Sequence, residues 1–387
     1  MKTVRLKQKE ERRIVRGHPW VFSNELLQPV GEFSTGEIVD VLDFAGSFVG
    51  RGYINPHTLI AVRILTRKRE EINSDFFRAR IDAARALRTA LGFGESFRAV
   101  FSEGDGLPGL IVDKYADTLV VQALTAGIDR MLNIVIPALQ DEYSPKAIVL
   151  RNDAASRELE GLILERRVIY GTITGPVTIE EAGIRYNVDV LEGQKTGFFF
   201  DQRENRQALK DYVKGRRTLD CFCYIGAWSL AAARFGASSV TGIDTSEKAI
   251  KLASENAALN GLSAQFKTAD VFDELHRLEK TRQRFGCIIL DPPAFVKSRA
   301  KVREALKGYK EINRRAMKLI EPNGASVSCS CSHHIDQELF REMLIDSASS
   351  VKRQARLLEM RSQARDHPMP LAAPETQYLK CAVLQID

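Results

Sequence analysis

Three side chains capable of chemistry stand at the ends of short apolar runs in this chain. They are Asp244, Asp291 and Cys331. If the runs are neighbouring parallel strands, their carboxyl ends meet at one edge of a sheet, where open α/β proteins bind ligands. A carboxylate there can accept both hydroxyls of a ribose, and a thiolate there can act as a nucleophile. The pattern therefore indicates a nucleoside-containing ligand near a reactive cysteine.

The segment 218–244 indicates which nucleoside. It reads as a strand, a tight turn, the Ala-rich helix Trp228–Phe235 and a second strand. A dinucleotide fold needs G-x-G-x-x-G so that the backbone can approach a pyrophosphate, but this turn holds Gly226 alone. S-adenosylmethionine (SAM) has no phosphate and tolerates a bulkier turn. The segment favours SAM over a nicotinamide cofactor, and a turn that binds nothing is the alternative.

The run Asp291-Pro292-Pro293-Ala294-Phe295 follows the fourth expected strand of this region. The two prolines fix φ and leave carbonyl groups without a local partner, and Phe295 can stack on a planar base. A rigid turn with a core phenylalanine is the alternative. The run resembles the D-P-P-[YF] signature of amine methyltransferases, so by itself it indicates nitrogen as the methyl acceptor.

The later run SVSCSCSHH, residues 326–334, points to carbon instead. Carbon C5 of a pyrimidine is a poor nucleophile until a thiolate adds at C6, whereas transfer to nitrogen needs no protein nucleophile. A cysteine in a polar turn beside a sulfonium can have a lowered pKa, and we assign this role to Cys331. Cys329 is interpreted as a small buried thiol. His333 and His334 are given no role.

The same cysteines allow a metal site as a second interpretation. Cys221 and Cys223 could join Cys329 and Cys331 as four thiolate ligands. We expect no metal, because C-x-C is not the usual zinc spacing and both pairs stand beside the expected cofactor cleft.

Composition limits the class of protein. The 387 residues are 44% hydrophobic and 27% charged, without an apolar run long enough to span a membrane or an apolar leader. We therefore expect a cytoplasmic protein with reduced thiols and no membrane partner. The net charge is +6, with basic clusters in 1–16 and 297–303. Two such clusters beside a methyl-donor motif favour a polyanionic substrate, although each alone can be a solvated face.

Three domains are expected, with boundaries near residues 70 and 183. Residues 1–70 read as a compact β-barrel of short strands such as Glu37–Leu42 and Leu59–Leu65, and residues 71–183 as a small α+β domain. Residues 184–387 alternate strand and helix, which predicts a parallel sheet with right-handed crossovers. Its expected strands are 218–221, 239–243, 264–268, 286–290 and 324–329.

The central domain has its own predicted elements. A helix over Ser74–Leu91 begins at Ser74 as its N-cap and stops at Gly92. Gly109–Tyr115 and Thr118–Leu124 form a hairpin. A helix over Asp129–Leu139 and a strand over Ala147–Arg151 follow.

Nearly the whole chain resembles the large-subunit ribosomal RNA (cytosine-5-)methyltransferase I family of SAM-dependent enzymes. The segments that carry the resemblance are GHPWVF (17–22), EGDGLPGLIVD (103–113), KTGFFFDQRENR (195–206), 219–229, 291–297, KGYKEIN (307–313) and the Ser-Cys-Ser of 330–332. The resemblance implies a PUA-like RNA-binding domain, a central α+β domain and a C-terminal Rossmann-like methyltransferase domain. Two departures are Cys329, where many relatives lack a cysteine, and His333, where glycine is frequent.

The resemblance also implies roles for individual residues. Lys195–Arg203 would form a strand and loop leading into the cofactor site, Asp220 and Gly226 would line the methionine moiety, and Asp244 would bind the ribose. Asp270, which can also be a helix N-cap, would read the adenine. The residues expected to bind the cofactor are Lys195, Thr196, Phe200, Asp201, Gln202, Arg203, Asp220, Phe222, Tyr224, Gly226, Asp244, Thr245, Asn260, Asp270, Val271, Phe272, Asp291 and Pro292.

The resulting hypothesis is an RNA 5-methylcytosine methyltransferase with Cys331 and Asp291 as catalytic residues. Pro293, Phe295 and Lys297 would contact the substrate, and the target base would be flipped out or unpaired. Hydrophobic strands near the N-terminus could pair two chains as a homodimer. Two alternatives stay open: an amine methyltransferase acting on nucleic acid or protein, and a non-catalytic RNA-binding or ribosome-assembly protein. Cys329 as nucleophile is not excluded.

Overall fold

The computed structural model describes residues 1–295 and 301–387, and these residues form two compact units. Unit 1 comprises residues 1–179, 188–200 and 365–376, and unit 2 comprises residues 180–187, 201–364 and 377–387. Unit 1 contains most of both the expected N-terminal and central domains, so the boundaries at 70 and 183 stay predictions. In the described part of the chain, no helix combines the length and apolarity of a membrane span.

The N-terminal part of unit 1 is a five-stranded sheet in the order β1-β3-β4-β5-β2. Its apolar side chains, Val39 and Val62 among them, form a separate core. The short helix α1 packs Ile14 inward and leaves Arg12 exposed. The elements are β1 (Lys2–Arg5), α1 (Glu11–Val15), β2 (Trp20–Phe22), β3 (Glu37–Leu42), β4 (Phe48–Ile54) and β5 (Ile60–Thr66).

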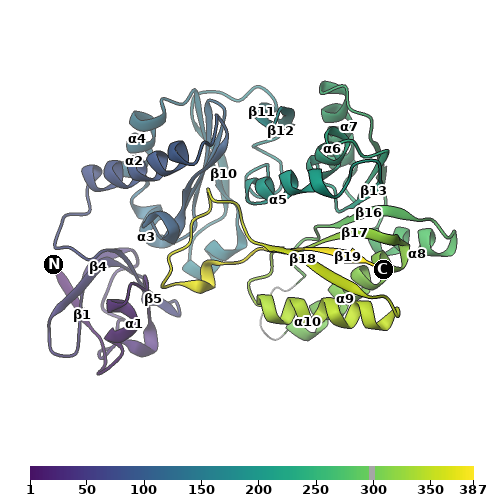
Figure 1. The fold of residues 1–387 in the computed structure, drawn as a ribbon. Coiled ribbons are helices and arrows are strands. Elements are labelled where there is room, and N and C mark those ends of the chain that lie inside the picture. Colours follow the sequence, from purple (N-terminus) through teal and green to yellow (C-terminus); the bar gives the residue numbers. More distant parts are fainter. Residues whose placement is uncertain (296–300) are drawn as a thin grey trace. The chain divides into compact units, whose positions relative to one another are not determined.

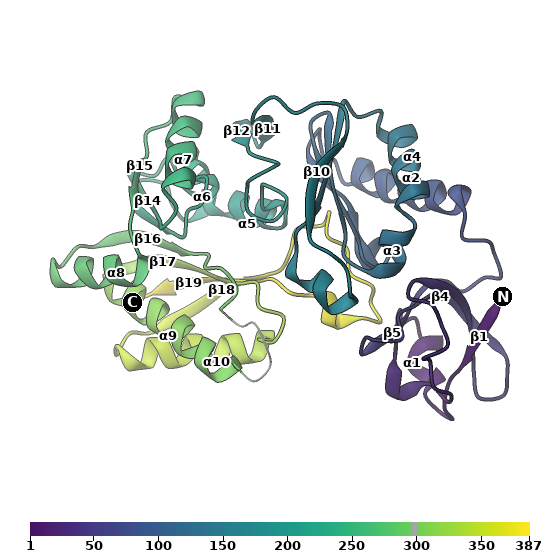
Figure 2. The same cartoon turned by 180° about the vertical axis from the view of Figure 1, so that it is seen from behind.

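Unit 1 contains a second five-stranded sheet, in the order β10-β9-β8-β7-β6. Figure 2 shows this sheet with β10 labelled and with α2, α3 and α4 beside it. The expected hairpin is present, since Leu110 pairs with Ala123 and Tyr115 with Thr118. The elements are α2 (Ser74–Ala90), β6 (Phe97–Phe101), β7 (Leu110–Tyr115), β8 (Thr118–Ala123), α3 (Ala126–Arg130), α4 (Leu132–Tyr143), β9 (Ala147–Asn152) and β10 (Glu165–Tyr170).

Two helix predictions in this part were wrong in detail. Asn73, not Ser74, caps α2, because its side chain accepts a hydrogen bond from the Phe76 backbone N–H. The single helix expected over Asp129–Leu139 is two helices that meet at Met131. The apolar pattern runs through this break, so periodicity alone could not locate it.

The chain then forms the two-stranded sheet of β11 (Val177–Glu181) and β12 (Ile184–Val188). The segment 195–199, expected to begin with a strand, consists of turns and bends. A 3₁₀ turn, η4 (Phe200–Gln202), and helix α5 (Arg203–Ala208) follow it. The strand expected there was therefore wrong.

Unit 2 is built on a seven-stranded sheet in the order β15-β14-β13-β16-β17-β19-β18 (Figure 1). The first five strands of that order are parallel, whereas β19 is antiparallel to both β17 and β18. The strands are β13 (Arg217–Cys221), β14 (Ser239–Asp244), β15 (Gln265–Thr268), β16 (Phe285–Leu290), β17 (Ile320–Ser330), β18 (Ala355–Arg361) and β19 (Lys380–Ile386). The sequence pattern predicted the five parallel strands and missed the antiparallel pair.

Helices cover both faces of this sheet. Figure 1 shows α6 and α7 on one face and α8, α9 and α10 on the other. The helices are α6 (Ala227–Arg234), α7 (Glu247–Leu259), α8 (Val271–Lys280), α9 (Val302–Leu319) and α10 (Gln337–Ser350). The core beneath α8–α10 includes the buried residues Leu219, Ile288 and Tyr309. Because helices cover both faces of the sheet, the strands are apolar along nearly their whole length. Ligands of such sheets bind at the carboxyl ends of the parallel strands.

Candidate active site

The parallel strands bring the expected acidic and thiol side chains to one edge. Asp220 is the penultimate residue of β13, Asp244 is the last residue of β14, and Asp291 directly follows β16. Cys331 directly follows β17, which lies beside β16 in the sheet. Residues separated by more than a hundred positions in the sequence are thus collected at a single sheet edge.

The turn after β13 has an unusual backbone. Phe222, Tyr224 and Gly226 have φ values of 66°, 48° and 84°. The first two are costly for residues with a Cβ atom, and such strain is concentrated at ligand sites. Asp244 holds the turn, because its Oδ2 accepts from the Tyr224 N–H at 2.9 Å while its Oδ1 accepts from the Ser246 N–H at 2.9 Å. The carboxylate is therefore fixed, and its remaining lone pairs can accept ribose hydroxyls.

Asp220 is fully buried behind this turn. Ser229 Oγ donates to its Oδ2 at 2.6 Å, and its Oδ1 has no partner among the described residues. Burial, together with the charges of Asp291 and Asp244, raises the pKa of Asp220 to about 7. A sheet edge that gathers three carboxylates is suited to a cationic ligand, and SAM carries both a sulfonium and an ammonium group. The residues present therefore fit SAM.

Asp291 is partly buried and held by two donors. Trp228 Nε1 donates to Oδ2 at 2.9 Å, and Gln202 Nε2 donates to Oδ1 at 3.0 Å. Asn205 Nδ2 donates to Gln202 Oε1 at 2.7 Å, which fixes the orientation of that amide. Burial and the charge of Asp201 raise the pKa of Asp291 to about 6, against the effect of the Trp228 hydrogen bond. A carboxyl group with this pKa can lend or accept a proton near neutral pH.

Aromatic rings line the same edge. The ring of Phe295 lies 4.7 Å from Tyr309, 6.1 Å from Phe272 and 6.4 Å from Phe222 between centroids. Phe295 stays partly exposed while it packs against the core. Both interpretations of this residue, core packing and base stacking, are compatible with that position.

The two neighbouring cysteines differ in environment. Cys329 is fully buried and pairs in register with Cys381 of β19. Burial raises the pKa of Cys329 well above its usual value, and contact with Cys381 adds to the effect. Cys331 is the one partly exposed cysteine of the six in the chain, and none forms a disulfide. Only Cys331 combines access with a place at the sheet edge.

Buried polar contacts support the loop after Cys331. Tyr309 Oη lies 3.0 Å from Ser332 Oγ, and Lys380 Nζ donates to the Ser332 carbonyl at 2.7 Å. Tyr378 Oη donates to Asp201 Oδ2 at 2.6 Å. Sequence reasoning missed Trp228, Tyr378 and Lys380. Trp228 stands inside the cofactor turn motif and could have been found there, whereas the other two lie on or beside a strand that the pattern did not reveal.

The structure places some expected cofactor residues in other roles. The Asn260 side chain is bonded to the Arg185 backbone on both sides, at 2.8 and 2.6 Å, and lies at the far end of α7 from the carboxyl edge. Arg203 Nε is paired with Glu181 at 3.1 Å. Asp270 caps α8 through the Asp273 N–H. Asp270 nevertheless follows β15 at the same edge as Asp244, whose carbonyl accepts from the Ala269 N–H at 2.9 Å. The cofactor roles expected for the three residues stay predictions.

The remaining expected residues are distributed as follows. Lys195, Thr196 and Phe200 belong to unit 1, where Thr196 Oγ1 donates to Asp113 at 2.6 Å. Val271 and Pro292 are buried, and Pro293 and Thr245 are exposed. Lys297 lies outside the described residues.

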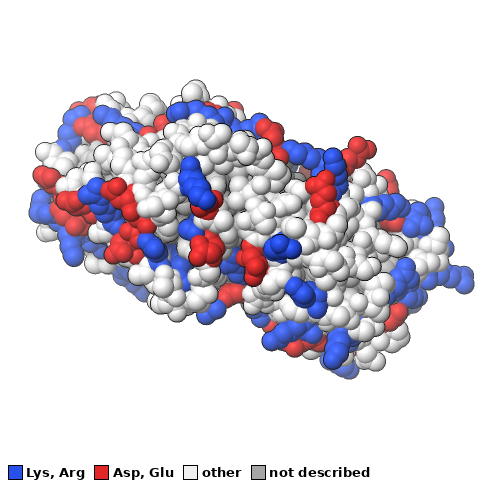
Figure 3. Space-filling model, turned by 90° about the horizontal axis from the view of Figure 1, so that it is seen from above, with Lys and Arg blue, Asp and Glu red and all other residues white. Residues whose placement is uncertain are grey.

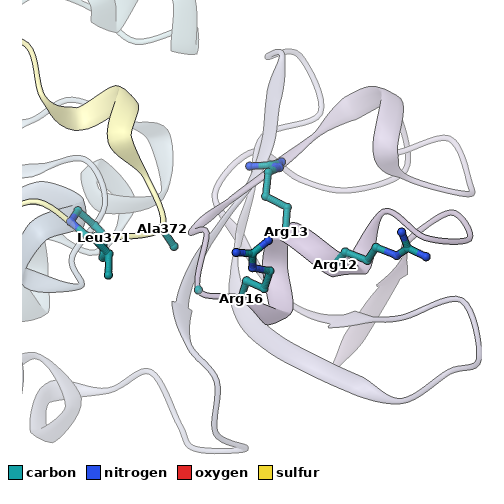
Figure 4. Close-up of a pocket in the computed structure, with 7 residues that line it drawn as sticks. Arg12, Arg13, Arg16, Leu371 and Ala372 are labelled. Carbon is teal, nitrogen blue, oxygen red and sulfur yellow. The ribbon is translucent and has the colours of Figure 1, made fainter.

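A second candidate surface lies within unit 1. A hollow of about 760 Å³ is lined by Arg12, Arg13 and Arg16 on one side and by Pro370, Leu371 and Ala372 on the other (Figure 4). Arg13 is paired with Glu25 at 2.7 Å, whereas Arg12 and Arg16 are exposed and have no side-chain partner among the described residues. Positive and negative side chains are interspersed over the face in Figure 3, so local geometry identifies this surface better than net charge.

The sequence is similar to those of known proteins along nearly its whole length. Residues 4–67 match the family model of a PUA-like domain, and residues 163–368 match that of an S-adenosylmethionine-dependent methyltransferase. Ribosomal RNA large subunit methyltransferase I from Shewanella denitrificans is 39% identical, and that from Shewanella amazonensis is 40% identical, each over 99% of both chains.

Solved structures share the fold over the full chain. The structure of a putative SAM-dependent methyltransferase from Streptococcus mutans has a TM-score of 0.86 at 21% identity. A second structure, of a putative methyltransferase in complex with SAH, has a TM-score of 0.88 at 21% identity, and each covers 100% of both chains. The expected PUA-like and Rossmann-like fold is confirmed. With SAM as its cofactor, this chain belongs to the ribosomal RNA large subunit methyltransferase I family of SAM-dependent methyltransferases.

Proposed function

We propose that this enzyme forms 5-methylcytosine in large-subunit ribosomal RNA through a covalent adduct between Cys331 and C6 of cytosine. The observation that carries the proposal is the pairing of Cys331, the one partly exposed thiol, with Asp291 at the ends of adjacent strands. An amine methyltransferase would need the carboxylate but would leave this thiol without a role.

The residues divide the reaction between them. The Cys331 thiolate adds to C6, and the electron pair of the C5–C6 bond shifts so that C5 becomes nucleophilic. Asp291 faces the N3 side of the ring and lends the proton that neutralises the charge there. Trp228 and Gln202 keep its carboxyl group in one orientation. Bound SAM supplies the methyl group as an electrophilic carbon.

Release reverses the addition. Water takes the C5 proton, the electron pair of that bond rebuilds the C5–C6 double bond, and Cys331 leaves as a thiolate. The N3 proton returns to Asp291, so both side chains end in their starting states. Asp220 and Asp244 would hold the methionine and ribose portions of SAM beside them.

The RNA would be held outside the stacked helix at the target base. C5 and C6 of a stacked cytosine cannot reach a partly buried thiol, so the nucleotide must be unpaired or flipped. Phe295 offers a ring on which the displaced base can stack. The exposed Arg12 and Arg16 would contact phosphates elsewhere on the same RNA.

The test is nucleoside analysis after reaction. Large-subunit RNA from cells that lack the gene is incubated with the enzyme and SAM carrying a labelled methyl group, digested and analysed by mass spectrometry. We expect label in 5-methylcytidine. Label in an N-methylated nucleoside would establish the amine methyltransferase, and SAM binding without label in any RNA would favour a non-catalytic role.

A further inference from the structure

A buried lysine lies beneath the loop that carries Cys331. Lys380 begins β19 and pairs in register with Ser330, the last residue of β17. It is 4% exposed. Its Nζ donates to the Ser332 carbonyl at 2.7 Å and to the Tyr378 carbonyl at 2.8 Å. An ammonium group has three N–H donors, and no third acceptor is found among the described residues.

A buried ammonium is costly unless nearby groups stabilise its charge. Burial lowers the pKa of Lys380 to about 8, while Cys331 and Asp336 act in the opposite direction. Lys380 therefore stays mostly protonated at pH 7. Asp336 is already engaged as the N-cap of α10 through the Leu339 N–H, at 2.8 Å. The carbonyls of Ser332 and Tyr378 and the carboxylate of Asp336, which also caps α10, do not fully offset the cost of burying the Lys380 charge.

We propose that Lys380 is a positioning residue that fixes the loop carrying Cys331 and stabilises its thiolate. Its hydrogen bond to the carbonyl of residue 332 holds the loop one residue beyond the sulfur. The positive charge favours ionisation of the thiol, whose proton passes to solvent, while Lys380 keeps its own proton. The inference deepens the proposed cytosine chemistry, on which its functional consequence rests.

The other groups around Cys331 do not supply that charge. Tyr309 of α9 interacts with Cys331, but burial raises the pKa of its hydroxyl and keeps it neutral. Asp291, which directly follows the neighbouring β16, is acidic and supplies no positive charge. Asp336 is also acidic, and the ring of His333, in the same loop as Cys331, lies 5.4 Å from Tyr378 between centroids. Lys380 is the lysine buried beside this loop, and at pH 7 it is mostly protonated.

Three substitutions separate charge from position. Lys380→Met removes both the charge and the donor, Lys380→Gln keeps a donor without a charge, and Lys380→Arg keeps both. Lys251→Met is the matched control, because this lysine is 81% exposed on α7 and pairs, within the described residues, only with Glu255 at 4.0 Å. Calorimetry with SAM and thermal unfolding identify the variants that retain a folded cleft.

The measurement is the rate of Cys331 alkylation by iodoacetamide as a function of pH, followed by peptide mass spectrometry in the absence of RNA. We expect the pH of half-maximal rate to rise by about one unit in the Met and Gln variants and to stay near wild type in the Arg variant and the control. Methylation at pH 7 should fall about tenfold in the first two and recover at higher pH.

Unchanged alkylation midpoints in either neutral variant that still binds SAM would overturn the proposal. Because alkylation needs no RNA, the result is independent of the methylated product. A shifted midpoint in an enzyme that makes no 5-methylcytosine would uphold the effect of Lys380 on the thiol and refute the cytosine reaction. An unshifted midpoint in an active enzyme would refute the role of Lys380 alone.

Discussion

At the scale of single residues, two cysteines that are close in the sequence differ in burial. Cys329 and Cys331 stand two positions apart, yet one packs against Cys381 inside the sheet and the other lies just past the strand end. The sequence predicted this difference because Cys329 reads as part of an apolar strand and Cys331 as part of the polar, serine-rich turn that follows it. It could not predict that Trp228 and Gln202 hold Asp291, because hydrogen bonds across a sheet edge depend on the tertiary arrangement.

The two cysteines should respond differently to substitution. Cys331→Ala should abolish methylation, a loss of at least about a thousandfold, because no other accessible thiol can add to C6. Cys329→Ala should leave turnover within about threefold and lower stability by about 1 kcal/mol through a small cavity. Steady-state methylation and thermal unfolding measure both effects. Full turnover by Cys331→Ala with loss in Cys329→Ala would reverse the assignment.

Asp220 should make stability depend on pH. Its pKa is raised to about 7 when folded, from about 4 in the unfolded chain, so the folded state retains the proton that the unfolded state loses between these values. Its contribution to stability is therefore lost as pH rises from about 4 to about 7. Asn cannot ionise, so Asp220→Asn should gain stability relative to wild type across this range, by a few kcal/mol in all. Denaturant unfolding at pH 5 and pH 8 measures the gain, and a pH-independent difference would contradict this account.

At the scale of elements, the sequence pattern predicted the alternating strands and helices of unit 2 and missed its antiparallel strands, β18 and β19. The five parallel strands were found because each is a short apolar run between helices. β18 and β19 escaped because no helix separates them and the residues of β18 are largely exposed. The break at Met131 and the cap at Asn73 depend on local backbone geometry that apolar periodicity does not encode.

Helix α5 depends on a buried ion cluster. Glu181 accepts from Arg206 at 2.7 Å and from Arg203 at 3.1 Å, and all three side chains are buried. Glu181→Gln should destabilise unit 2 by about 3–5 kcal/mol, because two guanidinium groups lose their carboxylate. It should also weaken SAM binding, since α5 follows Gln202. Glu255→Gln, which breaks a 4.0 Å surface pair, should cost less than about 1 kcal/mol. Equal effects of the two substitutions in calorimetric unfolding would contradict the structural role of the cluster.

At the scale of the whole molecule, one chain combines a methyl-transfer domain with a PUA-like domain. The sequence predicted a β-barrel and a parallel sheet from its patterns, and the PUA-like and methyltransferase domains from family resemblance. Net charge alone was a weak guide, because acidic side chains accompany the basic ones on the surface (Figure 3). The hollow beside α1 is more specific, since Arg12 and Arg16 are exposed there without side-chain partners among the described residues.

RNA binding should depend on these arginines. The double substitution Arg12→Ala, Arg16→Ala should weaken binding of large-subunit RNA about tenfold or more at low salt. It should also reduce the slope of log affinity against log salt by about 1.5, because two phosphate contacts are lost. SAM affinity should stay unchanged. Arg341→Ala, at an exposed site on α10, is the control. An unaltered salt slope in the double variant would remove this surface from the RNA interface.

The covalent step can be observed directly. RNA that contains 5-fluorocytosine is incubated with the enzyme and SAM, and the protein is digested and mapped by mass spectrometry. After methyl transfer, C5 carries fluorine in place of a removable proton, so the sulfur cannot leave. We predict an RNA-linked peptide that contains residue 331, absent without SAM-dependent transfer and absent in Cys331→Ala. Methylated RNA with no cross-linked peptide, or a cross-link at another residue, would contradict the central claim.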